Sequence, residues 1–232
     1  MRVHVAFTPD ESAAAPTGVV IDVIRATSTI CQALASGYER VLCAAEVEQA
    51  KALREADARV TLGGERLGVR IDGFDLGNSP REYLEARTPT LAISTTNGTR
   101  AIVTAAERCE RVLIASLLNL EAVTEEARSH GDDVAIFCAG VKGAFALDDS
   151  YVAGRIASLL GGERSDAAEA AVRLAASYPT AEEALRASRS GRNLINHGPA
   201  LEADIAYCAQ ESVLSVVPRL TGRDGVAAEI RG

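Results

Sequence analysis

The stretch GVVIDVIRATST at Gly18–Thr29 decides the fold. Five β-branched residues fall between Val19 and Ile24, which is the pattern of a strand buried on both faces. One carboxylate, Asp22, interrupts this run. A lone buried aspartate needs a cation or hydrogen-bond donors, because burying it without them costs free energy. The stretch therefore predicts a central strand whose buried carboxylate has a cation or hydrogen-bond donors beside it.

Directly after this strand, the sequence changes to the pattern of a helix N-terminus. Arg25 is followed by the hydroxyl residues Thr27, Ser28 and Thr29, and then by an apolar helical pattern that stops before Gly37. A strand, a hydroxyl-rich turn and a helix N-terminus present free backbone N–H groups and a positive dipole end to an anion. The alternative is a capped helix whose preceding aspartate bonds a neighbouring turn, and this stretch alone leaves both interpretations open.

Length and charge narrow the class of protein. The chain has 232 residues, of which 47% are hydrophobic and 24% charged, and its formal net charge is −8. This length accommodates one large α/β domain or two small ones. The chain has no run rich in Lys and Arg, which argues against nucleic-acid binding. An acidic protein that binds an anion must concentrate Arg, Lys or a metal cation at its site.

Cysteine usage and hydropathy indicate the compartment. The five cysteines are scattered without a Cys-x-x-Cys motif, so reduced thiols fit better than a zinc site or a disulfide framework. The first five residues, MRVHV, lack the apolar stretch of a signal peptide. Apolar runs stay far below the roughly 18 residues that a membrane helix needs. We therefore expect a cytoplasmic protein without a membrane span.

Strand and helix patterns alternate along the chain. The expected strands after the opening stretch cover residues 40–43, 59–62, 90–94, 111–115, 134–139 and 213–217, and residues 2–7 form an edge strand before it. The expected helices cover residues 46–56, 80–86, 100–108, 119–129 with Asn119 as N-cap, 148–160, 165–177, 180–191 with Thr180 as N-cap, and 199–211. This alternation predicts a largely parallel sheet covered on both faces. We expect a single domain over residues 1–232, with a helical subdomain at residues 162–198 as the alternative.

The segment at residues 63–80 differs from the rest of the chain. It holds five glycines and many polar residues, with little periodicity. Long loops of this kind inside compact domains tend to be functional. Ile71, Phe74 and Leu76 give the segment apolar anchors. We therefore predict an ordered active-site loop without regular structure.

Four segments place polar side chains where ligands bind in a parallel sheet, beyond the carboxyl ends of the strands. These segments cover residues 22–29, 63–80, 95–99 and 140–149. They supply the carboxylates Asp22, Glu65, Asp75, Asp148 and Asp149, the cations Arg25, Arg66 and Lys142, and the neutral donors Thr27, Ser28, Thr29, Asn78, Ser79, Thr96, Asn97 and Thr99.

The chemistry of these side chains indicates a reaction class. Oxygen ligands without a suitable His or Cys set match magnesium. Hydroxyls, backbone amides and arginine suit phosphate oxygens. Together they predict metal-assisted phosphoryl transfer. The three histidines His4, His130 and His197 are isolated in the sequence and are expected to be structural. The alternative for His197 is that the Asn196–Gly198 turn reaches the site.

In chain order the motifs read VVIDVIRATST from Val19, GGER from Gly63, GFDLGNSP from Gly73, TTNGTRA from Thr95, CAG from Cys138 and LDD from Leu147. This series resembles the 2-phosphosulfolactate phosphatase family, known from coenzyme M biosynthesis, over nearly the whole chain. The resemblance implies a three-layer α/β/α fold around a largely parallel or mixed sheet. It also implies magnesium-dependent hydrolysis of 2-phosphosulfolactate to sulfolactate and phosphate. The family's motif positions fall on Asp22, Arg25, Glu65, Arg66, Asn78, Thr96, Asn97 and Asp149, and Asp148 stands where the family more often has Glu.

Roles follow as hypotheses from this resemblance and from the side-chain chemistry. Asp22, Glu65 and Asp149 would bind magnesium and form the catalytic set together with Arg25. Arg25 and the turn at residues 95–99 would hold the phosphate, and Arg66, Asn78 or Lys142 the sulfonate or carboxylate end. The complete expected binding set is Arg25, Thr27, Ser28, Arg66, Asn78, Ser79, Thr95, Thr96, Asn97, Gly98, Thr99 and Lys142. The nucleophile is either a carboxylate or water.

Two other functions stay open from the sequence. The first is a phosphatase for another small phosphorylated hydroxy acid. The second is a non-catalytic protein that binds small anions, although the acidic residues Asp22, Glu65 and Asp149 argue against a pure anion binder. The sequence does not define the oligomeric state, and a homodimer is a hypothesis.

Overall fold

The strand β2, Thr17–Ile21, lies in the interior of the sheet and is buried at every position. It pairs in parallel with β7, Arg111–Ala115, on one side and with β8, Val134–Cys138, on the other. Val20 packs into one hydrophobic core, whereas its two neighbours in the strand pack into a second core on the opposite face. The uninterrupted apolar run is therefore explained by burial on both faces.

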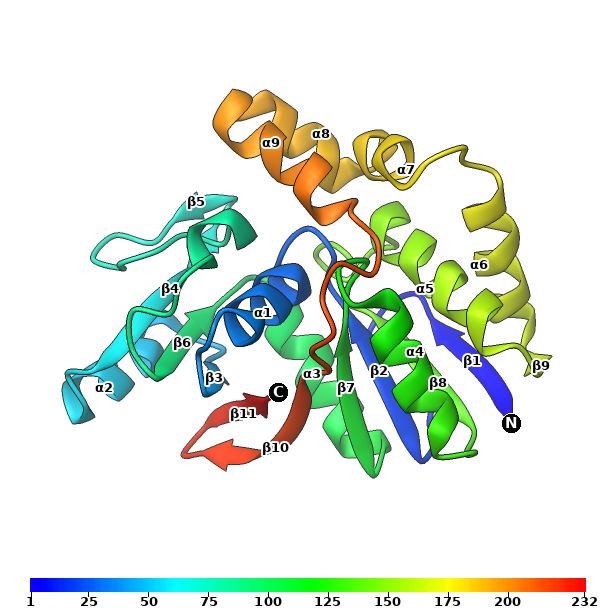
Figure 1. Ribbon diagram of the computed structural model, residues 1–232, viewed down its shortest axis with the longest axis horizontal. Helices are drawn as coiled ribbons and strands as arrows, with labels where there is room; N and C mark the ends of the chain where they lie inside the picture. Colours follow the sequence, from blue (N-terminus) through cyan, green and yellow to red (C-terminus); the bar gives the residue numbers. More distant parts are fainter.

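The computed structural model describes residues 1–232 and places all strands in one mixed sheet (Figure 1). The remaining strands are β1 Arg2–Ala6, β3 Arg40–Cys43, β4 Val60–Arg66, β5 Val69–Arg70, β6 Thr90–Ser94, β9 Glu163–Arg164, β10 Arg219–Asp224 and β11 Ala227–Arg231. Their order in the sheet is β5-β4-β6-β3-β11-β10-β7-β2-β8-β1-β9. β1 pairs with β8 and with the two-residue β9, so the expectation that it forms an edge strand is wrong.

Helices cover both faces of the sheet. They are α1 Ala26–Ala35, α2 Val47–Ala56, α3 Gly98–Arg108, α4 Leu120–Ser129, α5 Leu147–Leu160, α6 Asp166–Ala176, α7 Ala181–Ala187, α8 Arg189–Asn196 and α9 Pro199–Cys208, with a short 3₁₀ turn, η1, at Pro80–Tyr83. α3 packs Ile102 into the same core as Val20, whereas α4 and α5 pack Val123 and Ile156 into the core on the other face. This arrangement confirms the expected three-layer α/β/α class.

The C-terminal hairpin β10–β11 makes the sheet mixed, and sequence reasoning missed it. Both strands are antiparallel to their neighbours, and together they separate β7 from β3. No residue of β10 is fully buried, so the strand carries no apolar run by which to recognise it. The Asp224–Gly225 pair, which is common in hairpin turns, was the sequence feature that could have revealed this hairpin. The strand expected at residues 213–217 is wrong, because this segment runs without a strand partner.

The segment at residues 63–80 is ordered, but its first part is regular structure. β4 continues to Arg66, four residues beyond the expected end, and forms a short hairpin with β5. Phe74 and Leu76 are buried, which confirms that apolar anchors hold the rest of the segment. Glycine at position 64 is required, because its φ is 142° and a Cβ atom there would overlap the carbonyl oxygen of Ser94 on β6.

The helices near the C-terminus lie over the edge at which the parallel strands end. Figure 1 shows α7, α8 and α9 together above the ends of β1 and β2. The helix expected over residues 180–191 is in fact two helices, because Ser188 has an extended backbone and its hydroxyl caps α8 by accepting from the N–H of Gly191. Thr180 caps α7 as expected. The single domain, with a helical subdomain at residues 162–198 as its alternative, stays a prediction.

Asn119 does not cap α4 as expected, whereas the cysteines have the expected state. Asn119 precedes α4, but its side chain accepts a hydrogen bond from the N–H of Ser116 and does not cap the helix. All five cysteines are free thiols, and only Cys109 is not fully buried, as expected for reduced cysteines. No helix combines the length and the apolar character needed to cross a membrane.

The fold predicts that Gly64→Ala is strongly destabilising. The new Cβ must displace the backbone of β6 and also forces a φ that L-residues rarely adopt. We expect the free energy of unfolding to fall by about 2–4 kcal/mol, measured by urea denaturation. Gly222→Ala is the matched control, because a Cβ at this position meets no atom within 4 Å. A wild-type stability for Gly64→Ala would contradict the packing described above.

Candidate active site

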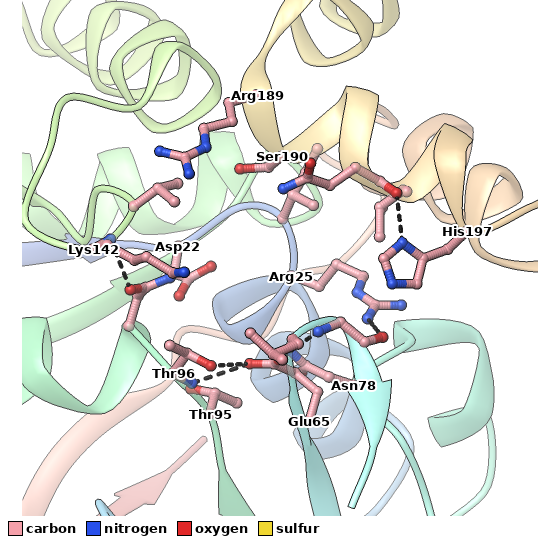
Figure 2. Close-up of a pocket in the computed structure, with 17 residues that line it drawn as sticks. Asp22, Arg25, Glu65, Asn78, Thr95, Thr96, Lys142, Arg189, Ser190 and His197 are labelled. Carbon is pink, nitrogen blue, oxygen red and sulfur yellow. Dashed lines mark hydrogen bonds between the residues drawn. The ribbon is translucent and has the colours of Figure 1, made fainter.

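A pocket of about 270 Å³ opens at the carboxyl edge of the sheet, beneath α8 (Figure 2). It brings together eight residues expected from the sequence: Asp22, Arg25, Glu65, Asn78, Thr95, Thr96, Asn97 and Lys142. The other lining residues are Ile24, Leu67, Gly68, Val141, Arg189, Ser190, Asn193, Leu194 and His197. Segments far apart in the chain therefore converge on one site, as the parallel-strand argument predicts.

Asp22 follows the last residue of β2 and lies at the N-terminus of α1. Its backbone N–H donates to the hydroxyl of Thr27 at 3.1 Å, and its carbonyl oxygen accepts from the N–H of Thr27 at 2.9 Å. The carboxylate itself accepts one long hydrogen bond, from the N–H of Ala26 at 3.4 Å. The hydroxyl of Thr27 thus fixes the turn, and the Asp22 carboxylate is left to face the pocket.

Arg25 begins α1 and is almost fully buried, with 4% of its surface exposed. One end of its guanidinium donates to the carboxylate of Asp204 at 2.6 Å. The other Nη atom donates to the carbonyl oxygen of Gly68 at 3.0 Å. Figure 2 shows Arg25 and His197 on one side of the pocket, whereas Asp22, Lys142 and Arg189 lie on the opposite side.

Glu65 ties β4 to the turn that precedes α3. Its carboxylate accepts from the N–H and the hydroxyl of Thr96, at 3.0 and 2.9 Å, and from the N–H of Gly68 at 2.7 Å. Three donors already satisfy this carboxylate, so its charge is balanced by the protein itself. Glu65 therefore shapes the floor of the pocket between its two sides.

Asp148 and Asp149 lie side by side in the first turn of α5, and both are buried. Asp149 accepts from the N–H of Val23 at 2.9 Å and from the N–H of Gly140 at 3.0 Å, so it joins two loops at the strand ends. Neither aspartate lines the pocket. Oδ1 of Asp148 is buried without a hydrogen-bond donor, although the hydroxyls of Ser188 and Ser190 favour the charged form of this carboxyl. Asp149 is therefore hydrogen-bonded within the fold through both oxygens, whereas one oxygen of Asp148 is not.

Burial makes the ionised forms of these aspartates costly. It raises the pKa of Asp22 to about 7, an effect that the nearby charges of Asp148 and Glu65 strengthen and the N–H of Ala26 opposes. Burial likewise raises the pKa of Asp148 to about 6. It also raises the pKa of Asp149 well above its ordinary value, and the charges of Asp148 and Asp22 add to this shift. The three carboxyls therefore share protons and titrate as a group.

Six residues of the expected binding set do not line the pocket, because the fold uses their side chains or leaves them no room. They are Thr27, Ser28, Arg66, Ser79, Gly98 and Thr99. Arg66, for example, donates to the carbonyl oxygen of Glu65 and to the hydroxyl of Ser94. Gly98 lies so close to Asp22 that a Cβ atom would come within 3.1 Å of its carboxylate. These residues build the frame of the site.

The expected three-carboxylate metal set does not receive support from the geometry. No group of three or more His, Cys, Asp or Glu side chains is arranged to hold a metal ion. The reason is visible in the hydrogen bonds, since Glu65 and Asp149 are each engaged by several N–H or hydroxyl donors of the protein. Asp22 is the member of the set that faces the pocket with little hydrogen bonding.

The wall formed by α8 was missed by sequence reasoning. Arg189, Asn193 and His197 are spaced four residues apart, which places them on one face of a helix. This spacing was the sequence feature that could have revealed the wall, but the helix expected over residues 180–191 ends before Asn193 and His197. His197, expected to be structural, also lines the pocket. The wall adds Arg189 and a histidine to the polar lining.

The raised pKa values predict how stability depends on pH. Unfolded aspartates titrate near pH 4, so the folded protein binds more protons than the unfolded chain between about pH 4 and 7. Stability therefore falls as the pH rises through this window. We expect the free energy of unfolding, measured in urea with EDTA, to drop from about pH 5 to about pH 7.5 by on the order of 2 kcal/mol.

Two variants separate this effect from general charge effects. Asp22→Asn removes one of the responsible groups and should flatten the pH dependence. Asp72→Asn, at an exposed residue without a hydrogen bond to the site, should keep the wild-type slope. Identical slopes for the two variants would contradict the assignment to Asp22.

Comparison with known proteins identifies the family of the chain. A family model described as 2-phosphosulpholactate phosphatase matches residues 4–223. A protein of Thermus thermophilus named probable 2-phosphosulfolactate phosphatase is 42% identical over 235 residues, which cover 98% of each chain. Proteins with the same name from Carboxydothermus hydrogenoformans and Deinococcus radiodurans are 40% and 38% identical, and the alignments cover 94% and 98% of this chain and 92% and 97% of theirs. The chain therefore belongs to the 2-phosphosulpholactate phosphatase family, as its ordered motifs predicted.

Proposed function

We propose that this protein is a phosphatase that hydrolyses the phosphate ester of a small sulfonated hydroxy acid, 2-phosphosulfolactate, to sulfolactate and phosphate. Family membership supports the reaction class. The observation that carries the proposal is a single pocket with cationic side chains on two opposite sides and a carboxylate, Asp22, on one of them. Such a pocket matches a compact molecule with several anionic groups.

The side of Asp22 is the proposed reaction end. It lies at the N-terminus of α1, and the turn at Thr95, Thr96 and Asn97 leads there into α3. Neither helix carries an acidic residue in its first turn, so both N-termini favour an anion. Lys142 and Arg189 lie on the same side (Figure 2) and are available for the phosphate oxygens.

The side of Arg25 is the proposed recognition end. Its guanidinium is buried and held by two hydrogen bonds, and His197 lies on the same side of the pocket. A sulfonate or a carboxylate of the substrate would bind here while the phosphate reaches Asp22. This assignment moves the phosphate away from Arg25, where the sequence hypothesis put it, because Figure 2 separates Arg25 from Asp22.

Magnesium fits this site through a smaller set of residues than the sequence suggested. Asp22 and Oδ1 of Asp148 are carboxylate oxygens with few or no hydrogen-bond donors, which is what a divalent cation would satisfy. Magnesium usually takes one or two protein carboxylates and completes its shell with waters and substrate phosphate. Asp22 would hold the ion, because it lines the pocket and has little hydrogen bonding, and the nearby charge of Asp148 would add to the attraction, whereas neither Asp148 nor Asp149 lines the pocket. When bound, the cation neutralises charge on the phosphoryl oxygens.

The residues of the chain supply the other parts of the reaction. Arg25 binds the non-reacting end of the substrate equally in the ground state and in the transition state, and so contributes to affinity. The positive dipole ends at the N-termini of α1 and α3 stabilise negative charge on the phosphoryl group as the ester bond breaks. Leu67, Val141 and Leu194 add apolar surface to the lining, which limits water around these charges. The expected cytoplasmic location and homodimer, and the expected lack of a nucleic-acid partner, stay predictions.

A substrate panel tests the proposed function. Phosphate release is measured from 2-phosphosulfolactate, phospholactate and phosphoglycolate with and without magnesium. We expect kcat/KM to be at least about tenfold higher for the sulfonated ester, because a charged contact at the recognition end contributes about 1.5 kcal/mol or more. Equal values would point to another hydroxy acid, and binding without turnover to a non-catalytic anion binder.

The variant Asp22→Asn tests the role of the pocket carboxylate. It keeps the size of the side chain but removes the charge, so we expect turnover to fall by about 100-fold or more. The rise in melting temperature on adding magnesium, measured without substrate, should also disappear. Asp72→Asn should keep both properties, because this residue is exposed and outside the pocket. An Asp22→Asn protein with near-normal turnover would refute the role of Asp22.

A further inference from the structure

Asp204 on α9 is a fully buried carboxylate that does not line the pocket, yet its strongest partner does. Its surface is 0% exposed. It accepts hydrogen bonds from Nη1 of Arg25 and from the hydroxyl of Ser79, both at 2.6 Å. Arg81 adds an ion pair at 3.5 Å. One carboxylate thus connects α9 with the N-cap residue of α1 and with the η1 turn.

Arg25 depends on Asp204 for both its charge balance and its orientation. A buried guanidinium without a counter-charge is costly, and Asp204 is the carboxylate with which it pairs. Its second hydrogen bond goes to a neutral carbonyl oxygen, that of Gly68. A guanidinium has five N–H groups in one rigid plane. The hydrogen bonds to Asp204 and to Gly68 therefore fix the directions in which the other N–H groups point. The remaining N–H groups can therefore serve a ligand in the pocket.

We propose that Asp204 is a positioning residue for substrate recognition, which holds the guanidinium of Arg25 in the orientation that binds the non-reacting anionic group of the substrate. This inference rests on the proposed function of the pocket. Asp204 acts through Arg25 alone and touches no reacting atom. Its loss should therefore weaken substrate binding more than it slows the chemical step.

The kinetic test uses Asp204→Asn, which keeps the shape of the side chain and removes its charge. We expect KM for 2-phosphosulfolactate to rise by about tenfold while kcat stays within about twofold, because ground-state and transition-state binding are lost equally. Arg81→Gln is the matched control: it removes the weaker, partly exposed partner of Asp204 and should keep the wild-type KM. An unchanged KM in folded Asp204→Asn would overturn the proposal.

A double-mutant comparison covers the case in which Asp204→Asn does not fold. Arg25→Gln combined with Asp204→Asn removes both buried charges, so no charge stays unpaired. We expect the double variant to have the same KM as Arg25→Gln alone, because Asp204 has nothing left to position. A further tenfold rise in KM on adding Asp204→Asn would show that Asp204 acts independently of Arg25, and would overturn the inference.

A spectroscopic measurement separates this inference from the proposed function. In ¹⁵N NMR of the full chain without substrate, the Nη groups of Arg25 should rotate slowly in the wild type and fast in Asp204→Asn. Equal rotation in both proteins would overturn the positioning role, whatever the enzyme hydrolyses. If the wild type released no phosphate from any ester but Arg25 were immobilised only with Asp204 present, the proposed reaction would fail and the positioning role would stand.

Discussion

The buried ion pair between Arg25 and Asp204 is the interaction on which the pocket depends. It joins Arg25, the N-cap residue of α1, to α9, which packs against the α8 wall of the pocket and lies 179 residues later in the chain. Breaking such a pair by removing one partner typically costs about 3–5 kcal/mol, because it leaves a buried charge without compensation. The pair therefore fixes where the C-terminal helices sit on the sheet, and it fixes a cation at one end of the pocket.

A cluster of buried aspartates lies at the other end of the pocket. Asp22, Asp148 and Asp149 are buried close enough to raise one another's pKa values. Two backbone N–H groups bind Asp149, and the hydroxyls of Ser188 and Ser190 favour the charged form of Asp148, whereas the carboxylate of Asp22 accepts only one long hydrogen bond. A carboxylate with so little hydrogen bonding is unfavourable for the isolated fold and useful for binding a cation. The site thus combines a paired charge at Arg25 for recognition with an unpaired charge at Asp22 for chemistry.

Much of the fold could be predicted from local patterns. The strands at 40–43, 90–94 and 111–115 follow from short apolar runs, and burial on both faces makes such runs easy to recognise. The hairpin β10–β11 could not be recognised in this way, because β10 has no fully buried residue and owes its place to neighbours that are distant in sequence.

The candidate site was predictable wherever residues follow a strand end. Asp22, Thr95–Asn97 and Lys142 lie in such turns, and all reach the pocket. Arg66 and Ser79 lie in the right segments, but side-chain direction is a tertiary property that sequence spacing does not determine. Asp204 and Arg189 come from helices whose packing over the sheet has no local signature. The polar face of α8 can be assigned to the pocket only when its position over the strand ends is known.

The most direct test of this account is a crystal structure of the protein with sulfolactate and phosphate bound. We expect phosphate at the N-termini of α1 and α3 beside Asp22, and the sulfonate or the carboxylate of sulfolactate on the guanidinium of Arg25. Phosphate bound to Arg25 with the organic acid beside Asp22, or both products outside the pocket, would contradict it.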